Sequence, residues 1–258
     1  MFDVNLDLSD RIAIVTGASR GQGIGAAVCR MLARHGADIF FTHWRAYDRE
    51  QPYGEDPGGP DDLMGELEAT GVRAASAEID LAEPDAAVRV MGQVEEMLGS
   101  PSILVNNAVH SRMTNVTTID ATSLDAHYAV NVRALVLLSV EFARRFRQGY
   151  GGRIINFTSG QGVTPMPETL AYVTTKGAVE AFTTSLAAGV AHLGITVNAI
   201  DPGGTDTGWM PEELRQGILE SSAFGRIGQP ADAARLVTFL ASEAGEWITG
   251  QVIRSRGA

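Results

Sequence analysis

The hydrophobic and polar positions of this 258-residue chain fall into two alternating patterns. Short runs rich in Val, Ile and Phe, bounded by polar residues or Gly, predict buried β-strands. Longer stretches with apolar residues three and four positions apart predict amphipathic helices. The expected strands cover residues 11–16, 38–42, 74–79, 102–105, 153–158, 195–200 and 251–254. The expected helices cover residues 26–35, 63–70, 84–98, 123–147, 170–192 and 230–242.

Strands alternate with helices throughout, and no repeat is evident. This order predicts one α/β domain over residues 1–258, with a seven-stranded, mostly parallel sheet and helices on both faces, the doubly wound Rossmann type. Residues 46–62 are rich in Pro, Gly and acidic side chains, which predicts an extended surface loop between two α/β units. The less regular residues 205–225 are interpreted as a substrate loop.

Composition narrows the classes of function. The formal net charge of −11 argues against nucleic acid or an anionic membrane as a partner. No apolar run reaches about 18 residues and the N-terminus lacks the apolar core of a signal peptide, so neither a membrane span nor export is expected. The single cysteine, Cys29, is interpreted as a small buried helix residue; it allows no internal disulfide and favours a reducing compartment, the cytoplasm. No metal site is predicted.

A glycine-rich segment joins the first expected strand to the first helix. It reads Gly17-Ala18-Ser19-Arg20-Gly21-Gln22-Gly23-Ile24-Gly25. Glycines let a backbone approach a pyrophosphate closely, and a helix N-terminus adds free N–H groups and a positive dipole end. The segment therefore predicts a dinucleotide site.

The end of the second strand indicates which nicotinamide cofactor is preferred. An acidic residue there would bind the adenosine ribose and repel a 2′-phosphate, but none lies between residues 42 and 46. His43, Trp44 and Arg45 follow the strand instead. The side chains of His43 and Arg45, with Arg20 of the glycine-rich segment, could bind a 2′-phosphate. The sequence thus favours NADP(H) over NAD(H).

Other strand ends also carry polar residues. Asp80 follows the third strand, where it could bind an adenine amino group with Leu81 packed on the ring, or equally cap the next helix. Asn106 and Asn107 follow the fourth strand and could brace neighbouring backbone through their side chains. Asn131 stands within an expected long helix, where Asn is a poor helix former, so we propose a functional polar role for it.

Tyr172 and Lys176 are four residues apart on an expected helix, which places a phenol and an ammonium group on one face. A positive charge beside a phenol favours the phenolate, so we expect the Tyr172 pKa to fall below its ordinary value of about 10. Tyr172 could then act as a general acid or base near neutral pH. The alternative is an ordinary exposed helical pair.

Together these motifs resemble the short-chain dehydrogenase/reductase family, including its 3-oxoacyl reductases, over almost the whole chain. The interval from Ser159 to Tyr172 is thirteen residues, as in the family. The matching elements occur in the family's order: Thr16-Gly17 with Gly23-Ile24-Gly25, Asp80, Asn106-Asn107-Ala108, Asn131, Ser159, Tyr172 with Lys176, and Pro202-Gly203.

The resemblance implies a role for each matching position. Tyr172 would exchange a proton with the substrate oxygen during hydride transfer, and Ser159 would hydrogen-bond the same oxygen. Lys176 would bind nicotinamide-ribose hydroxyls and lower the Tyr172 pKa, Asn131 would hold a proton-relaying water, and Thr205 would bind the carboxamide. The implied dinucleotide contacts are Gly17, Ser19, Arg20, Gly23, Ile24, His43, Trp44, Arg45, Asp80, Leu81, Asn107, Ala108, Tyr172, Lys176, Pro202, Gly203 and Thr205.

Three features depart from the family's pattern. Five residues separate Gly17 from Gly23 where the family has three, which we interpret as a two-residue insertion. Val109 replaces a glycine and would narrow the space beside the nicotinamide. Residues 255–257, Ser-Arg-Gly, replace a frequent Asp-Gly-Gly where subunits often meet, so assembly could differ.

The expected activity is NADPH-dependent reduction of a small-molecule ketone, or oxidation of the corresponding alcohol. The substrate-side candidates mix apolar groups with a few donors, which suits a medium-sized substrate, although each could equally be ordinary loop packing. Arg112 among them could pair with a substrate carboxylate. The candidates are His110, Ser111, Arg112, Gln161, Met166, Trp209 and Met210.

Two other functions are weighed: a reductase of 3-oxoacyl groups on acyl carrier protein, and a non-catalytic nucleotide sensor. Leu193 stands where carrier-dependent reductases often have an arginine, but Arg144, Arg145 and Arg147 could form a local basic patch. Retention of both Tyr172 and Lys176 argues against a sensor. The family also implies a homo-oligomer, a dimer or tetramer built on the helices at 123–147 and 170–192.

Overall fold

Seven strands form one parallel sheet in the computed structural model, which describes residues 5–257. The order β3-β2-β1-β4-β5-β6-β7 confirms the doubly wound prediction. The predicted domain limits, residues 1 and 258, lie outside the described residues. The strands are β1 (Ile12–Val15), β2 (Asp38–His43), β3 (Ala74–Glu78), β4 (Ile103–Asn106), β5 (Gly152–Phe157), β6 (Ile195–Asp201) and β7 (Val252–Arg254).

The strand order reverses at the boundary between β1 and β4, which are both central. Ile14 of β1 lies opposite Phe40 of β2 on one side and Leu104 of β4 on the other. In open α/β sheets, ligands bind beyond the carboxyl ends of the strands at such a reversal. The topology therefore places the dinucleotide site where the glycine-rich segment leaves β1.

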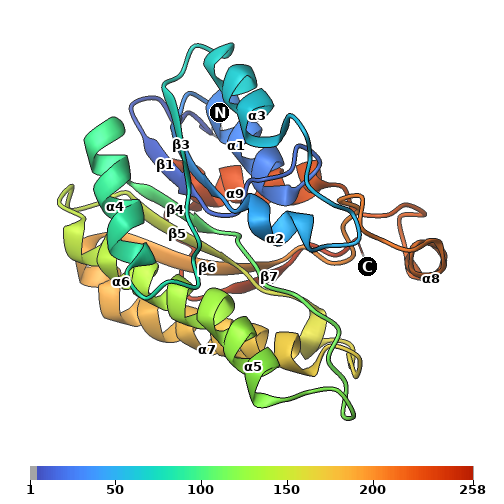
Figure 1. The fold of residues 1–258 in the computed structure, drawn as a ribbon. Coiled ribbons are helices and arrows are strands. Elements are labelled where there is room, and N and C mark those ends of the chain that lie inside the picture. Colours follow the sequence, from blue (N-terminus) through green and yellow to red (C-terminus); the bar gives the residue numbers. More distant parts are fainter. Residues whose placement is uncertain (1–4, 258) are drawn as a thin grey trace.

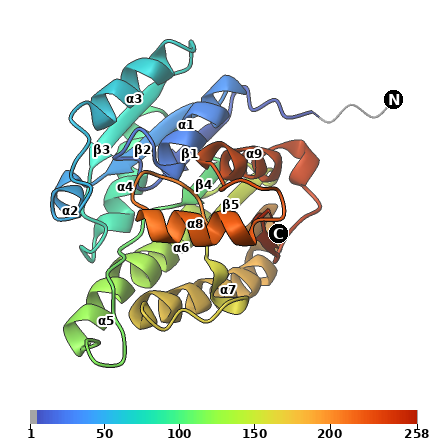
Figure 2. The ribbon, with the colours of Figure 1, turned by 90° about the vertical axis from the view of Figure 1, so that its right-hand side faces the viewer.

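Helices cover both faces of the sheet, as Figure 1 shows. α1, α3 and α9 pack on one face, and α4, α6 and α7 on the other. Figure 2 looks onto the edge where α8 crosses in front of the strands. The helices are α1 (Ile24–Arg34), α2 (Arg45–Arg49), α3 (Gly59–Glu68), α4 (Ala86–Met97), α5 (Ala121–Tyr128), α6 (Leu135–Arg145), α7 (Leu170–Val190), α8 (Glu212–Ser221) and α9 (Pro230–Ala241), with the short segments η1 (Ala129–Ala134), η2 (Gly160–Gly162), η3 (Ala191–Leu193) and η4 (Glu243–Gly245).

Two hydrophobic cores hold these layers together. Phe41 belongs to the core under α1, and its neighbour Phe40 to the core under α4 and α6. Successive strand side chains point to opposite faces, so a strand covered on both faces must be apolar throughout. β2 therefore reads as a continuous apolar run. Burying each such side chain stabilises the fold by about 1.5–3 kcal/mol.

The prediction of an extended loop at 46–62 is wrong at both ends. Arg45–Arg49 forms the short helix α2, and α3 begins at Gly59, before the predicted start at residue 63. Pro60 fits the first turn of α3, where its missing N–H is not needed, and two acidic residues there favour the positive end of the helix dipole. The segment 50–58 remains a loop.

Two further segments differ from prediction. The expected helix at 123–147 is interrupted by η1, a π-helical segment that contains Asn131. The residues expected to be irregular at 205–225 include α8. Within the part of the chain that the structure describes, no helix is both long and apolar enough to cross a membrane, and no group of three His, Cys, Asp or Glu side chains could hold a metal.

Candidate active site

The floor of the candidate site is a close contact between β1, β4 and α1. The Asn107 side chain donates to the carbonyls of Thr16 and Gly17, at 2.9 Å each, as expected from its position after β4. Gly17 has φ +74°, and a Cβ on it would lie 2.6 Å from Ala108 Cα. A Cβ on Gly25 would lie 2.6 Å from the Gly17 carbonyl oxygen. Glycine is therefore required at both positions.

The N-terminus of α1 faces this floor. Gly23 is the residue before the helix and Ile24 its first residue, which agrees with the two-residue insertion inferred from the sequence. The inserted turn is closed by a hydrogen bond from Gly23 N to Arg20 O, at 2.9 Å. The first N–H groups of a helix lack intrahelical acceptors, so this end suits a pyrophosphate.

The end of β2 presents basic groups, as predicted. Within residues 5–257, His43 Nδ1 and Arg45 Nε are buried without a hydrogen-bond partner. Buried polar atoms normally have a partner, and phosphate oxygens would satisfy both. Asp61 lies 3.5 Å from Arg45 but is 89% exposed, so this ion pair is weak. The residues present fit a dinucleotide that carries a 2′-phosphate.

Residues 44–58, which we call the strap, connect β2 to α3 and contact both the glycine-rich segment and the loop after β4. Both ends of the strap contact the glycine-rich segment: Ser19 Oγ accepts from Trp44 N at 3.1 Å, and Asp56 accepts from Gly21 N at 3.0 Å. Between these ends, the Tyr47 side chain contacts the loop after β4, where its Oη accepts from Ser111 N at 2.9 Å. The strap therefore crosses the carboxyl ends of β1 and β2, beside the predicted dinucleotide site.

The predicted 2′-phosphate contact Arg20 is engaged elsewhere in the structure. Its guanidinium donates to Thr207 O at 2.8 Å and stacks 3.8 Å from the centre of the Tyr53 ring. Arg20 thus joins the glycine-rich segment to the strap and to the loop before α8. Gln22, two residues further on, also lies close to Gly208 of that loop.

Arg112 is bound to the strap in this structure, and its suggested pairing with a substrate carboxylate remains a prediction. It pairs with Glu50 at 3.0 Å and donates to Gln51 Oε1 at 3.1 Å. The neighbouring His110 ring packs between Tyr47, 5.4 Å away, and His127, 4.7 Å away. Burial lowers the pKa of His110 to about 4, so its imidazole is neutral at physiological pH. His110 and Arg112 therefore support the loop.

Asn131 holds the same loop from the side of η1. Its Oδ1 accepts from His110 N at 2.7 Å, and its Nδ2 donates to His110 O at 2.9 Å and to Thr175 Oγ1 at 3.0 Å. These bonds make both backbone groups of residue 110 dependent on one side chain. The predicted role of Asn131 in holding a water remains a prediction.

Tyr172 and Lys176 lie on one face of α7, as predicted, with Lys176 Nζ 5.6 Å from the centre of the Tyr172 ring. Lys176 is buried and donates to Phe157 O at 2.7 Å. Burial lowers its pKa to about 8. Ser159 lies two residues beyond the end of β5, where its side chain lowers the pKa of the Tyr172 phenol.

The expected fall of the Tyr172 pKa is not found. Burial raises the pKa of this phenol; the hydrogen bond with Ser159 lowers it, and the negative charge of Asp201 and the nearby Tyr47 raise it further. Lys176 does not offset burial because its ammonium is directed to Phe157 O and is itself disfavoured by burial. The phenol therefore keeps its proton at neutral pH.

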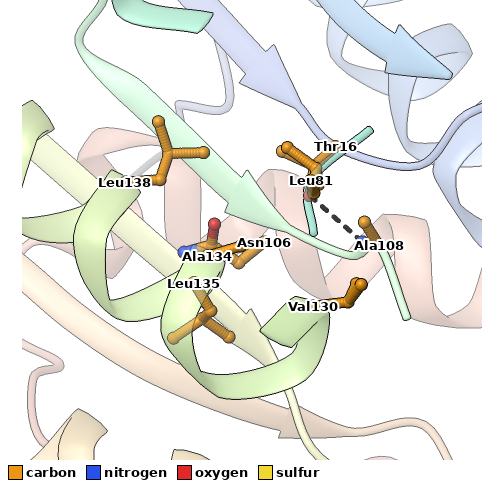
Figure 3. Close-up of a pocket in the computed structure, with 8 residues that line it drawn as sticks. All are labelled: Thr16, Leu81, Asn106, Ala108, Val130, Ala134, Leu135 and Leu138. Carbon is orange, nitrogen blue, oxygen red and sulfur yellow. Dashed lines mark hydrogen bonds between the residues drawn. The ribbon is translucent and has the colours of Figure 1, made fainter. Parts of the chain in front are cut away.

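Asp80 and Leu81 lie at the end of β3. Asp80 Oδ1 accepts from Ala82 N at 2.8 Å, which closes a local turn. Asp80 does not cap the following helix, because α4 begins at Ala86 with Asp85 as its N-cap. The predicted contact of Asp80 with adenine remains a prediction. Leu81 lines a small, mostly apolar pocket with Thr16 and Asn106, next to η1 and α6 (Figure 3). Ser159, Tyr172 and Lys176 do not line this pocket, so it is not the place of the predicted reaction.

The loop after β6 holds Pro202, Gly203 and Thr205. Thr205 is buried and donates to Pro202 O at 3.2 Å.

Of the substrate-side candidates, Trp209 is half exposed, whereas Gln161 donates to Thr158 Oγ1 and Glu180. Met166 and Met210 are partly buried, and Val109 is partly exposed. Cys29 is buried, as predicted, and burial raises the pKa of its thiol.

Several residues near the site were missed by sequence reasoning. Tyr47 and Asp56 belong to a segment without periodicity, so no pattern placed them. His127 is fully buried and its Nε2 accepts from Arg112 N at 3.1 Å, but as one helical histidine it gave no signal. Asp201 and Arg256, which form an ion pair at 2.9 Å, are 55 positions apart. The only sequence signal for this ion pair was that Asp201 directly precedes the Pro202-Gly203 motif.

Comparison with known proteins places this arrangement among characterised folds. A model of the family described as short chain dehydrogenase matches residues 11–217. The uncharacterized oxidoreductase YjdA of Bacillus subtilis is 49% identical over 96% of both chains. The NADPH-dependent aldehyde reductase-like chloroplastic protein of Arabidopsis thaliana is 36% identical over 98% of this chain and 95% of its own. A short chain dehydrogenase from Burkholderia cenocepacia, solved in complex with NADP, superposes with a TM-score of 0.87 at 33% identity, covering 97% of this chain and 98% of its own.

Proposed function

Because the chain belongs to the short chain dehydrogenase family, whose members are nicotinamide-dependent oxidoreductases of carbonyl and hydroxyl groups, we propose that it reduces a small-molecule carbonyl compound with NADPH. The cofactor supplies the hydride when bound. The observation that carries the proposal is the placement of the Tyr172 phenol and the buried Lys176 ammonium on one face of α7, with Lys176 Nζ 5.6 Å from the centre of the Tyr172 ring.

The proposed chemistry of the protein concerns the substrate oxygen. Tyr172 donates its proton to this oxygen as negative charge develops there, and the raised pKa of the phenol means that the proton is present at neutral pH. Ser159 orients the oxygen by a hydrogen bond. Lys176 holds the nicotinamide ribose, and its pKa of about 8 lets it return a proton to Tyr172 near neutral pH. Asn131 keeps the neighbouring loop in place.

The preference for NADP(H) rests on the end of β2. His43 Nδ1 and Arg45 Nε have unused donor or acceptor capacity among the described residues, and a 2′-phosphate would use it. Two similar proteins agree with this preference: one relative is named as NADPH-dependent, and one similar structure was solved in complex with NADP. An acidic side chain, Glu78 of β3, also lies near the end of β2. Its carboxylate accepts a hydrogen bond from Arg45 N at 3.2 Å.

The proposal is tested by following consumption of NADPH and NADH against aldehydes, ketones and acetoacetyl-carrier protein. We expect turnover with free carbonyl compounds and at least tenfold higher kcat/KM with NADPH. Arg45→Ala should raise KM for NADPH about tenfold or more without affecting NADH, because one charge-assisted hydrogen bond is worth about 1.5–3 kcal/mol. Arg49→Ala is the matched control, since Arg49 pairs only with exposed Glu55.

The outcome also separates the alternatives. Turnover of the carrier substrate alone would make the protein a 3-oxoacyl reductase. This is not favoured by the structure, because Arg145 of the suggested basic patch is neutralised by Glu141 and Glu95. NADPH binding without consumption by any carbonyl compound would instead indicate a nucleotide sensor and would contradict the proposal.

We also propose that the protein is a homo-oligomer, a dimer or tetramer, in the cytoplasm. Tyr128 of α5 and Leu137 of α6 are 53% and 42% exposed, and apolar groups on these helices would be buried by a second copy. Light scattering should give a mass of at least two chains, and Leu137→Glu should lower it to that of one. A single-chain mass for the unchanged protein would contradict this proposal.

A further inference from the structure

The C-terminal Arg256 lies between two loops of the proposed active site. Its guanidinium pairs with Asp201 at 2.9 Å, and Asp201 is only 1% exposed at the end of β6. The pairing of β7 with β6 fixes this arrangement, because Arg254 lies opposite Asp201 and Ser255 N donates to Asp201 O at 2.8 Å. The backbone just before Arg256 is therefore fixed by β6, and the Arg256 side chain by Asp201.

Two glycines provide the space that Arg256 occupies. Gly160 directly follows Ser159, and a Cβ at this position would overlap the Arg256 guanidinium. Gly203 belongs to the loop after β6, and a Cβ there would lie 2.9 Å from Arg256 Cα. Arg256 thus separates the segment that carries Ser159 from the segment predicted to contact the nicotinamide.

The two carboxylate oxygens of Asp201 bind the Gly203 turn and Arg256 respectively. Asp201 Oδ1 accepts from Gly203 N at 3.0 Å, while Oδ2 accepts from Arg256. A buried carboxylate without a partner is strongly disfavoured. The ion pair therefore stabilises the Gly203 turn and the position of the C-terminal residues together.

We propose that Arg256 is a positioning residue for the proposed reduction: with Asp201 it sets the separation between Ser159 and the Pro202–Thr205 loop, and it balances a carboxylate charge that acts on the Tyr172 phenol. This inference rests on the proposed function. The groups that act on the phenol come from four elements: Lys176 of α7, Ser159 after β5, Tyr47 of α2 and Asp201 of β6.

The two partners of the ion pair have opposite effects on Tyr172. Asp201 raises the pKa of the phenol. Arg256→Met leaves this negative charge unbalanced and should raise that pKa further, whereas Asp201→Asn removes the charge and should lower it. A purely structural role would give both variants the same effect, because each breaks the same ion pair.

The experiment compares Arg256→Met, Arg256→Lys and Asp201→Asn with Arg254→Met as control, since Arg254 is an exposed arginine at the end of β7, two residues before Arg256. We expect kcat for NADPH-dependent reduction to fall about tenfold in Arg256→Met, with KM for NADPH within about threefold, and to recover in part in Arg256→Lys. The alkaline limit of the pH profile should move up by about half a unit or more in Arg256→Met and down in Asp201→Asn. Arg254→Met should be unchanged.

Shifts in the same direction in both variants, or an unchanged kcat in Arg256→Met, would overturn the proposal. If Arg256→Met does not fold, Asp201→Asn decides the question: a downward shift of its alkaline limit, with Arg256→Lys close to the unchanged protein, supports the proposal, and an upward shift in Asp201→Asn overturns it. If the unchanged protein reduces no carbonyl compound, the proposed function fails separately. The Tyr172 pKa is then measured from tyrosinate absorbance, with Tyr172→Phe as the reference, and the predicted opposite shifts still apply.

Discussion

Replacing Tyr172 by phenylalanine is expected to lower kcat for carbonyl reduction by a factor of about 10²–10⁴, the usual contribution of a general acid. Only the phenolic oxygen is lost, and the ring keeps its place on α7 beside Lys176. NADPH affinity should therefore change by less than about threefold. Steady-state kinetics give the first quantity, and quenching of protein fluorescence on NADPH addition gives the second.

The direction of the pH dependence follows from the raised pKa of Tyr172. Burial favours the neutral phenol, so the proton needed for reduction is available throughout the neutral range and is lost only in alkaline solution. Reduction should accordingly be flat near neutral pH and decline as pH rises through the Tyr172 pKa. Alcohol oxidation needs the deprotonated phenol and should rise over the same interval. Tyr172→Phe should abolish both dependences.

Tyr150→Phe is the matched control for this experiment, because Tyr150 is 77% exposed and lies just before β5, outside the candidate site. Its kcat should remain within about twofold of the unchanged protein. A Tyr172→Phe variant that retained full turnover would remove Tyr172 from the mechanism, and the function would then need another proton donor.

Gly25→Ala is expected to have the largest effect on both stability and nucleotide binding. Its Cβ would lie 2.6 Å from the Gly17 carbonyl oxygen and 2.7 Å from Asn107 Nδ2. Helix α1 must then move away from β1, and the bonds from Asn107 to Thr16 and Gly17 are stretched or broken. The free energy of unfolding should fall by about 2–4 kcal/mol, from overpacking and lost hydrogen bonds.

Nucleotide binding should suffer as well because the N-terminus of α1 moves with the helix. We expect NADPH affinity to fall about 100-fold or more. Gly92→Ala is the matched control: Gly92 lies inside α4 and a Cβ there meets no atom within 4 Å. That change should raise the stability by about 0.5–1 kcal/mol, as alanine is the better helix former.

Urea unfolding and NADPH titration of both variants decide the matter. Wild-type stability and affinity in Gly25→Ala would mean that the contact between α1 and β1 relaxes at little cost. A comparable loss in Gly92→Ala would show that the effect is not specific to this contact.

The sequence by itself determined the features that depend on near neighbours along the chain. The apolar run of β2, with Phe40 and Phe41 buried on opposite faces, predicts a strand covered on both sides. Helical periodicity places Tyr172 and Lys176 on one face whatever surrounds them. The order of strands and helices then leaves few topologies, so the sheet, the glycine-rich segment and the position of Asn107 were all predictable.

Only the tertiary structure decided the features that depend on distant segments. Burial, not Lys176, governs the Tyr172 pKa, and burial is set by everything that packs around a group. Residues 46–62 gave no period from which α2 could be placed, and the pairing of Arg112 with Glu50 could not be predicted because the two residues are 62 positions apart. The ion pair of Asp201 with Arg256 arises because β7 pairs with β6. Local patterns fix backbone elements, whereas charge pairing and desolvation arise only when those elements are packed together.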